Sequence, residues 1–449
     1  MKFSIALFNF CFLLSIYATA QTTGLISGPW AGHVEIRNAT IWAEVMTDVK
    51  TVSVIYTAEG NKVEKTALYK GTLGKEFNTV KIELNGLDMN TKYNYKILIN
   101  GKPVILPYTT SFKTKDLWQY RKPAPDFNFL AGSCAYFNEP MYDRPGKPYG
   151  VDSSIFNIMA ATPAFFNLWL GDSWYTREAD FFTAWGMAYR VSGDRRMKVV
   201  QKFMSAMPHY FIWDDHDYGP NNAGKSFVFK NESREVFKNY TLNPSYGEDG
   251  KGIYTKMSYG DVDFFLTDNR YFRSENKLVD SIDGKPNTAK TYFGSMQMEW
   301  LKNALLYSSS PFKIIASGSQ VLNPVSTAES LRDYSYEYHE LMNFITAHKI
   351  TGVIFFTGDR HHSEVIKLER PTAYTLYDIT ISPLTASVGT LRGSEINNPA
   401  RLPNTLVEAQ NFGNISVTGP KDNRVLKVEF IGIKGDKIAE WKVNERELR

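Results

Sequence analysis

The sequence predicts an α/β (α+β) protein in which a β-sandwich precedes a larger α/β domain, and three observations support this prediction. The chain has 449 residues, which at about 100–200 residues per domain corresponds to two or three domains. Residues 22–115 contain short β-rich runs separated by turn signals, a pattern typical of a β-sandwich. After residue 126, short apolar strands alternate with helical stretches, which is typical of an α/β domain.

Residues 1–20 are predicted to be a secretory signal peptide. Lys2 precedes the apolar stretch Phe3–Tyr17, and the small residues of Ala18–Ala20 favour cleavage after Ala20. A helix that spans a bilayer needs about 20 apolar residues, so the stretch is short for the alternative of an uncleaved anchor. We therefore expect a secreted, periplasmic or cell-surface protein that has no transmembrane anchor after cleavage.

Six runs of the predicted sandwich, residues 21–115, are expected to be strands: His33–Ile36, Thr40–Val45, Thr51–Thr57, Thr79–Leu84, Tyr93–Ile99 and Tyr108–Lys113. The segment Gly86–Tyr95 resembles the strand-entry segment of fibronectin type III domains, where a tyrosine ties the corner between strands. A fibronectin type III or immunoglobulin-like sandwich is therefore expected. Residues 116–126 contain two prolines and are predicted to be a linker.

The second domain, residues 127–449, is predicted to contain more than one sheet. The expected strands are Phe127–Ala131, Ala164–Leu170, Tyr210–Trp213, Ile253–Ser258, Asp263–Asp268, Phe312–Ser317, Thr351–Thr357 and Tyr374–Ser382. The expected helices are Ser153–Ala160, Arg195–Ala206, Ser295–Leu306 and Ser335–Ala347. A last hairpin is expected to turn at residues 434–436.

Four polar clusters follow predicted strands of this domain: Gly132–Cys134, Gly171–Tyr175, Asp214–Asp217 and Gly358–His362. Each cluster alone is also typical of a turn. Together they hold three of the seven histidines, five aspartates and Cys134, which is the sole cysteine left after signal cleavage. Ligands of open α/β sheets bind at the carboxyl ends of strands, where these clusters lie.

The residue types of these clusters predict a metal centre. Carboxylates that converge on one site repel each other unless a cation lies between them. Cysteine, histidine and tyrosine beside carboxylates suit a transition metal, whereas an oxygen-rich neighbouring site suits a harder ion. For Cys134, the alternatives are an apolar buried thiol or a thiolate held by a metal.

The order of these motifs resembles the alkaline phosphatase D (PhoD-like) family of calcineurin-like metallophosphatases. The resemblance covers residues from about Phe127 to Asn414 and includes four further segments: Asp268–Arg273, Gly294–Leu301, Ser382–Leu384 and Asn411–Gly413. It implies a four-layer α/β/β/α metallophosphatase domain. Related sequences often have glutamate where this chain has Asp217.

The resemblance also implies roles for single residues. Its metal ligands would be Cys134, Asp172, Tyr175, Asp215, Asp359 and His361, with Asp172 bridging two metals. Asn221 or Asn222 could reach the second metal. His216 would act on the scissile phosphate as a catalytic residue. Arg270 either contacts a phosphate oxygen or forms a surface or interdomain salt bridge.

The function implied by the resemblance is that of a secreted metal-dependent phosphoesterase of the alkaline phosphatase or phosphodiesterase type. A metal-activated hydroxide would hydrolyse phosphate mono- or diesters at a two-metal centre. Fe³⁺ and Ca²⁺ are the expected metals, with Zn²⁺ or Mn²⁺ as alternatives. The 51 basic and 47 acidic side chains are too evenly balanced to indicate nucleic-acid binding.

Two other functions remain open from the sequence. One is a catalytically silent surface-binding or glycan-binding protein that retains a metal site. The other is a metal-dependent hydrolase of non-phosphate esters.

Overall fold

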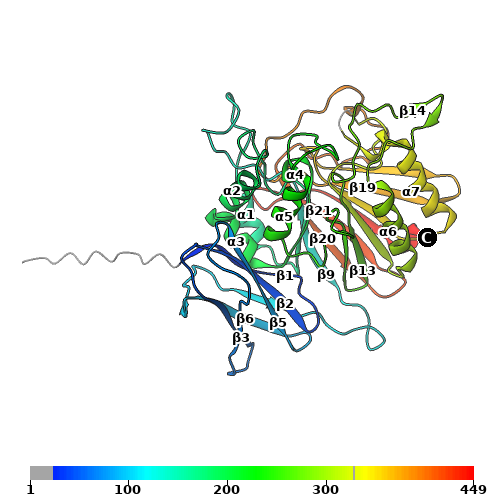
Figure 1. Ribbon diagram of the computed structural model, residues 1–449. Coiled ribbons are helices and arrows are strands. Elements are labelled where there is room, and N and C mark those ends of the chain that lie inside the picture. The colour runs from blue at the N-terminus through cyan, green and yellow to red at the C-terminus, as the bar shows by residue number, and fades with distance from the viewer. Residues whose placement is uncertain (1–23, 327–328) are drawn as a thin grey trace, which may run out of the picture.

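Two joined parts, a β-sandwich and a larger domain of paired sheets, make up the computed structural model (Figure 1). The structure describes residues 24–326 and 329–449, so the predicted signal peptide lies outside the described residues. Within this part of the chain, no helix is both long enough and apolar enough to cross a membrane.

The sandwich consists of two antiparallel sheets whose facing sides form one apolar core. The first sheet contains β1 (Leu25–Gly32), β2 (Asn38–Val45) and β5 (Asn78–Asn85). The second contains β4 (Lys65–Leu68), β3 (Val52–Ala58), β6 (Lys92–Ile99), β7 (Lys102–Pro103) and β8 (Ser111–Lys113). Buried and exposed residues alternate along β6, as expected for a strand with one face on the core.

A tyrosine ties the loop before β6 to the start of that strand. The Asp88 backbone N–H donates to the Tyr93 hydroxyl at 2.9 Å, and the same hydroxyl donates to Asp88 Oδ2 at 3.2 Å. This contact is the tyrosine corner that the fibronectin type III-like segment predicts.

The strand expected at His33–Ile36 is wrong, because the first strand is β1 (Leu25–Gly32). Two glycines and a proline within β1 hide its strand character from sequence patterning. His33 adopts a left-handed backbone with φ of 44° and follows the last residue of β1.

The larger domain contains two six-stranded sheets. Sheet I has the order β11 (His209–Ile212), β10 (Asn167–Leu170), β9 (Phe127–Gly132), β20 (Asn411–Thr418), β21 (Val425–Gly432) and β22 (Lys437–Asn444). Sheet II has the order β12 (Thr255–Tyr259), β13 (Val262–Leu266), β16 (Phe312–Ser317), β17 (Val353–Thr357), β19 (Ala373–Thr380) and β18 (Glu364–Arg370).

Helices cover the outer faces of both sheets, so the predicted four-layer architecture is confirmed (Figure 1). Sheet I packs against α1 (Ile155–Ala161), α2 (Ala184–Arg195), α3 (Lys198–Ala206) and α5 (Lys230–Tyr240). Sheet II packs against α6 (Gly294–Tyr307) and α7 (Ser335–Ala347). In β17, Ile354 and Phe356 join the core between the sheets, whereas Val353 and Phe355 face the helices.

Short elements complete this domain. They are α4 (Asp215–Tyr218), the hairpin of β14 (Ser281–Ile282) and β15 (Lys285–Pro286), and the 3₁₀ turns at Leu331–Asp333, Gly393–Glu395 and Glu445–Leu448.

The expected helix Arg195–Ala206 is observed as α3, which begins three residues later at Lys198 and ends at the expected residue. The helix α2, which precedes it, was not expected. The helix α2 buries polar as well as apolar side chains, among them Arg190 and Asp194. Without a clean apolar stripe, its helical period is weak in the sequence. The helix α5 was also not expected.

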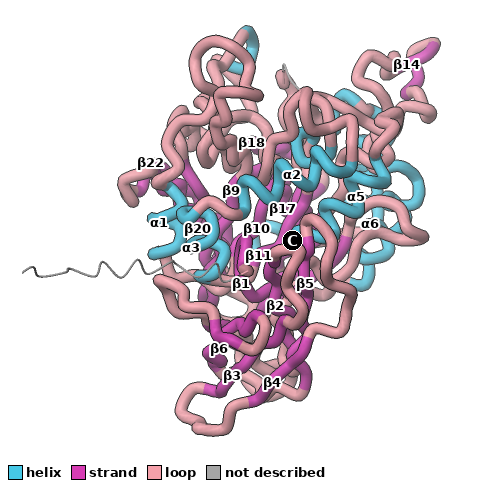
Figure 2. The backbone as a smooth tube through the Cα atoms, turned by 60° about the vertical axis from the view of Figure 1, so that its left-hand side comes forward, coloured by secondary structure: helices cyan, strands magenta, loops and turns pink. Residues whose placement is uncertain are grey.

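The sandwich packs tightly against the outer side of sheet I (Figure 2). The ring centroids of Trp30 and Trp42 in the sandwich lie 5.5 Å apart. The Trp30 ring packs edge-to-face on His209 of β11, with 6.0 Å between the ring centroids. The Trp42 indole N–H donates to the Asn239 carbonyl at 2.7 Å. Glu44 of β2 is fully buried beside these rings.

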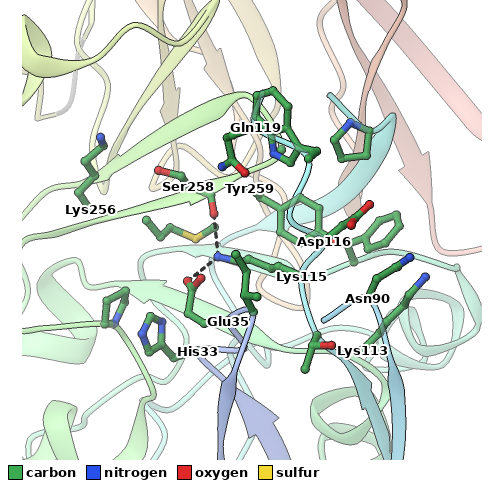
Figure 3. A pocket seen from close by; sticks show the side chains of 18 residues that line it. His33, Glu35, Asn90, Lys113, Lys115, Asp116, Gln119, Lys256, Ser258 and Tyr259 are labelled. Carbon is green, nitrogen blue, oxygen red and sulfur yellow. Dashed lines mark hydrogen bonds and ion pairs between the residues drawn. The ribbon is translucent and has the colours of Figure 1, made fainter. Parts of the chain in front are cut away.

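A hollow of about 360 Å³ lies where the two domains meet (Figure 3). Lys115 crosses it and donates to Glu35 Oε1 at 2.5 Å and to the Ser258 carbonyl at 2.8 Å. No predicted site residue lines this hollow. Lys115, at the end of the sandwich segment, therefore ties the sandwich to the larger domain, away from the predicted metal ligands.

Candidate metal centre

The four polar clusters come from strands that run in parallel within their sheets. β9, β10 and β11 are parallel neighbours in sheet I, and Cys134, Asp172 and Asp215 follow their carboxyl ends. Asp359 follows β17 of sheet II. The Ala135 N–H donates to the Asp172 carbonyl at 2.8 Å, which holds the first two clusters together.

Cys134, Asp172 and Tyr175 are buried and meet the partly buried His361 in one group. The Tyr175 hydroxyl donates to Asp172 Oδ2 at 3.0 Å and lies 3.4 Å from His361 Nε2. Cys134 Sγ lies 3.7 Å from the same Asp172 oxygen. Burial raises the pKa of the Cys134 thiol to about 12, with hydrogen bonds from Ser382 and other groups opposing the rise.

Asp172, Asp215 and His216 form the adjoining group. Each offers one ligand atom, and these three atoms lie within 4.8 Å of one another. Burial, followed by the charges of Cys134 and Asp215, raises the pKa of Asp172 well above its ordinary value. Cations fit this donor set, because its negative groups lack sufficient positive charge from the protein.

Asp359 provides a second indication of a cation. Its carboxylate makes no hydrogen bond or ion pair within residues 24–326 and 329–449, although the residue is half-buried. Burial, and after it the Asp214 charge, raises the pKa of Asp359 to about 7. A half-buried carboxylate without a partner suits a bound cation.

Four predicted ligands share an uncommon backbone conformation. The φ angles are 61° at Cys134, 51° at Asp172, 67° at Asp359 and 57° at His361. Left-handed backbone is disfavoured for residues other than glycine, and it concentrates at functional sites. At Cys134, the N–H groups of Thr385 and Ala386 both donate to its carbonyl, at 3.2 and 3.1 Å, and help to hold this conformation.

The hydrogen bond at the far side of the His361 ring fixes the role of each ring nitrogen. Nδ1 lies 2.6 Å from the Ser387 carbonyl, which can only accept a hydrogen bond. Nδ1 therefore carries the proton, and the lone pair of Nε2 faces Tyr175. A metal-ligating histidine usually has this arrangement.

His216 is stacked on Tyr175, with ring centroids 4.2 Å apart. Burial lowers the pKa of His216 from its ordinary value, and Asp215 opposes that shift. The ring is therefore neutral near neutral pH. The neighbouring His362 does not join the centre, because its Nε2 lies 3.3 Å from Glu364 Oε1.

Arg270 forms buried salt bridges within the larger domain, whereas the salt bridge expected from the sequence was one at the surface or between domains. It is 0% exposed, its Nε donates to Asp214 Oδ1 at 2.5 Å, and its Nη2 pairs with Glu329. The same Nη2 lies 3.9 Å from Asp215 Oδ1. A contact between Arg270 and a phosphate oxygen stays a prediction.

Asp217 takes a structural role. Its Oδ1 accepts the Ser173 N–H at 2.8 Å and the Trp174 N–H at 3.2 Å, while its Oδ2 accepts the Asp214 N–H at 3.0 Å.

The Asn222 backbone N–H donates to Asp215 Oδ2 at 2.7 Å. This contact leaves open which of Asn221 and Asn222 reaches a metal.

Sequence reasoning missed two residues of the centre. The Tyr149 hydroxyl lies 3.2 Å from His361 Nε2, and the Ser382 hydroxyl donates to Cys134 Sγ at 3.2 Å. The Ser382 hydroxyl also accepts the His361 N–H at 3.0 Å. Ser382 was noted only as a family mark, and Tyr149 lies in a loop without a motif.

A hollow of about 220 Å³ adjoins the group of Cys134, Asp172, Tyr175 and His361, called the metal-ligand group below. Tyr175, His216 and Asn221 line it. Residues of the loop between β9 and α1, among them Tyr136, Lys147 and Tyr149, also line it. A substrate can therefore reach His216 and the ligand group from this side.

Comparison with known families finds two matches along the chain. A model described as PhoD-like phosphatase matches residues 187–422, which is more than half of the chain. A model described as a domain of unknown function matches residues 22–117.

Single proteins are similar to this chain in sequence or in fold. Alkaline phosphatase D of Bacillus subtilis is 22% identical over 329 residues, which cover 64% of this chain and 54% of that protein. The chain thus matches about half the length of this relative. A solved structure of PhoD matches with a TM-score of 0.75 and 16% identity, covering 96% of this chain and 92% of the other. A purple acid phosphatase from yellow lupin (Lupinus luteus) matches with a TM-score of 0.64 and 13% identity, covering 93% and 74%.

Proposed function

Because this chain belongs to the PhoD-like phosphatase family, we propose that it is a metal-dependent phosphoric ester hydrolase with a two-metal centre. The observation that carries the proposal is the meeting of Cys134, Asp172, Tyr175 and His361 beside the Asp172–Asp215–His216 group. Phosphate mono- and diesters are the proposed substrates.

Two sets of ligands are proposed. One cation would be held by Cys134, Tyr175 and His361. The other would be held by Asp359 and by Asn221 or Asn222. Asp172 would bridge the two cations, and Asp215 would be a further ligand. Thiolate, phenolate and imidazole ligands suit Fe³⁺, and an oxygen-rich set suits Ca²⁺, with Zn²⁺ or Mn²⁺ as alternatives. Such cations draw charge from phosphate oxygens and lower the pKa of a bound water.

The chain's own side chains orient the substrate and handle protons. His216 lines the hollow, and its ring is held against Tyr175 at 4.2 Å. A neutral imidazole at this place can hydrogen-bond a phosphate oxygen, and once protonated it can give its proton to the leaving oxygen. Arg270, buried behind Asp214, acts as a positioning residue because it fixes the acidic side chains around it.

Turnover of 4-nitrophenyl phosphate and bis(4-nitrophenyl) phosphate by metal-loaded protein tests the proposal. Asp172→Asn is expected to abolish turnover. Asp249→Asn is a matched control, because Asp249 has φ of 50° against 51° at Asp172 but lies in an exposed turn.

Two outcomes would contradict the proposal. The absence of turnover for both phosphate esters would favour the silent binding protein. Turnover of 4-nitrophenyl acetate alone would favour a hydrolase of non-phosphate esters.

We also propose export by the general secretory route, on the basis of the Lys2 to Ala20 segment. The mature protein should begin at Gln21, which intact-mass measurement of the exported protein tests. An exported protein that still contains residues 1–20 would contradict cleavage.

A further inference from the structure

The hollow beside the metal-ligand group has an aromatic wall. The Tyr136 and Tyr149 rings meet edge-to-face at 4.8 Å, and Tyr136 meets Tyr175 in the same way at 5.0 Å. Phe181 also lines the hollow. Its volume of about 220 Å³ suits one ring with a substituent, since a cavity of about 150 Å³ holds benzene.

The charges around this hollow do not balance. Arg177 is buried and pairs with Asp143 at 3.0 Å, and Arg144 pairs with Glu178 at 2.8 Å. Lys147 also lines the hollow, is exposed, and forms no ion pair or hydrogen bond within the described part of the chain. Three basic side chains thus face two acidic ones, and the excess positive charge belongs to Lys147.

We infer that this hollow binds the organic group of the substrate and favours phosphate esters in which that group is a planar ring with a second anionic substituent. The inference rests on the proposed function, since it places the phosphate of the same molecule beside His216. Tyrosine rings at 4.8–6.1 Å from one another offer edges and faces against which a ring can pack.

The anionic substituent follows from Lys147. A carboxylate or second phosphate at the rim would pair with its ammonium group, whereas Arg144 and Arg177 already have carboxylate partners. Such a pair contributes mostly to selectivity between substrates, because it remains close to solvent.

Two chromogenic monoesters with similar leaving groups test the charge preference: 4-nitrophenyl phosphate and 3-carboxy-4-nitrophenyl phosphate. The wild type should show the higher kcat/KM for the carboxylated ester. In Lys147→Gln, the ratio of the two kcat/KM values should fall by about threefold to fivefold, the effect of one exposed charge pair. High salt should also lower the ratio of the two kcat/KM values for the wild type, because salt screens the charge pair.

Lys198→Gln is the matched control, because Lys198 is an exposed lysine at the start of α3 and does not line the hollow. It should leave the ratio unchanged. Phenylphosphonate should inhibit more strongly than methylphosphonate, because the ring packs against the tyrosines.

The outcomes separate this inference from the proposed function. Equal kcat/KM for both esters, or a ratio that Lys147→Gln leaves unchanged, would overturn the charge preference while the phosphatase proposal stands. Equal inhibition by the two phosphonates would overturn the ring preference. If metal-loaded wild type hydrolyses neither ester, the proposed function fails, and this inference fails with it.

Discussion

The Tyr175 hydroxyl donates a hydrogen bond to Asp172 Oδ2 at 3.0 Å. Both side chains are almost fully buried, at 1% exposure each. Burial raises the pKa of Tyr175 well above its ordinary value, and the Asp172 and Cys134 charges raise it further. In the protein alone, this proton relieves the repulsion between the two oxygens, and a cation bound there would replace it.

Tyr175→Phe removes the phenol that the proposal assigns to the first metal. If that metal is Fe³⁺, the wild type should show a visible tyrosinate charge-transfer band that the variant lacks. We expect kcat to fall at least about tenfold, since even indirect partners of metal ligands have effects of this size. Absorption spectra and steady-state kinetics measure both effects. A colourless wild type with full activity would rule out ferric iron.

Asp172→Asn replaces the proposed bridging carboxylate by a neutral amide of the same shape. The variant should lose metal and nearly all activity, because the amide provides no negative charge between two cations. Elemental analysis of wild type, Asp172→Asn and the control Asp249→Asn measures the loss. Unchanged metal content in Asp172→Asn would refute the bridging role.

Much of the fold follows from local sequence patterns. The predicted Phe312–Ser317 strand and Ser335–Ala347 helix match β16 and α7 to the residue. Each buries a clear set of apolar side chains, so the pattern reflects the packing. The helix α2 was missed because its buried set includes Arg190, which pairs with Asp180 at 2.8 Å.

The candidate site likewise contains residues that local sequence patterns indicate and residues that they miss. Asp172, Asp215 and Asp359 could be proposed from the sequence because each follows an apolar strand, and strand ends of parallel sheets converge. Tyr149 could not be found, because its position beside His361 depends on how the loop folds back over the site. The salt bridges of Arg270 depend equally on long-range packing, since Glu329 lies 59 residues further along the chain.

Arg270→Ala should lower the free energy of unfolding by about 3–5 kcal/mol, because it leaves the buried Asp214 carboxylate without its ion-pair partner and leaves Glu329 paired with Arg273 alone. Urea denaturation of metal-free protein measures this change. Arg144→Ala serves as a control, because its pair with Glu178 is exposed and contributes about 1 kcal/mol or less. Unchanged stability of Arg270→Ala together with a raised KM would instead indicate a phosphate contact.

Glu44 is expected to make the junction between the domains sensitive to pH. Burial raises its pKa above the ordinary value, against hydrogen bonds from Ser192 at 2.8 Å and Tyr240 at 3.0 Å. The folded state then holds the proton more tightly than the unfolded chain. The stabilisation from this group is therefore greatest below the ordinary pKa of about 4.3 and declines as the pH rises through the folded pKa.

Glu44→Gln keeps an acceptor for both hydroxyl groups but cannot ionise. The stability of the variant relative to that of wild type should increase as the pH rises above the ordinary carboxyl pKa of about 4.3. Thermal unfolding over a series of pH values measures the difference. Parallel stability curves for wild type and variant would show that Glu44 does not ionise differently in the two states.

Elemental analysis of purified, catalytically active protein tests the two-metal centre most directly. About two metal ions per chain are expected, and a chelator should remove them together with the activity, which reloading with metal should restore. Metal-free protein that hydrolyses phosphate esters at the wild-type rate would contradict the two-metal centre.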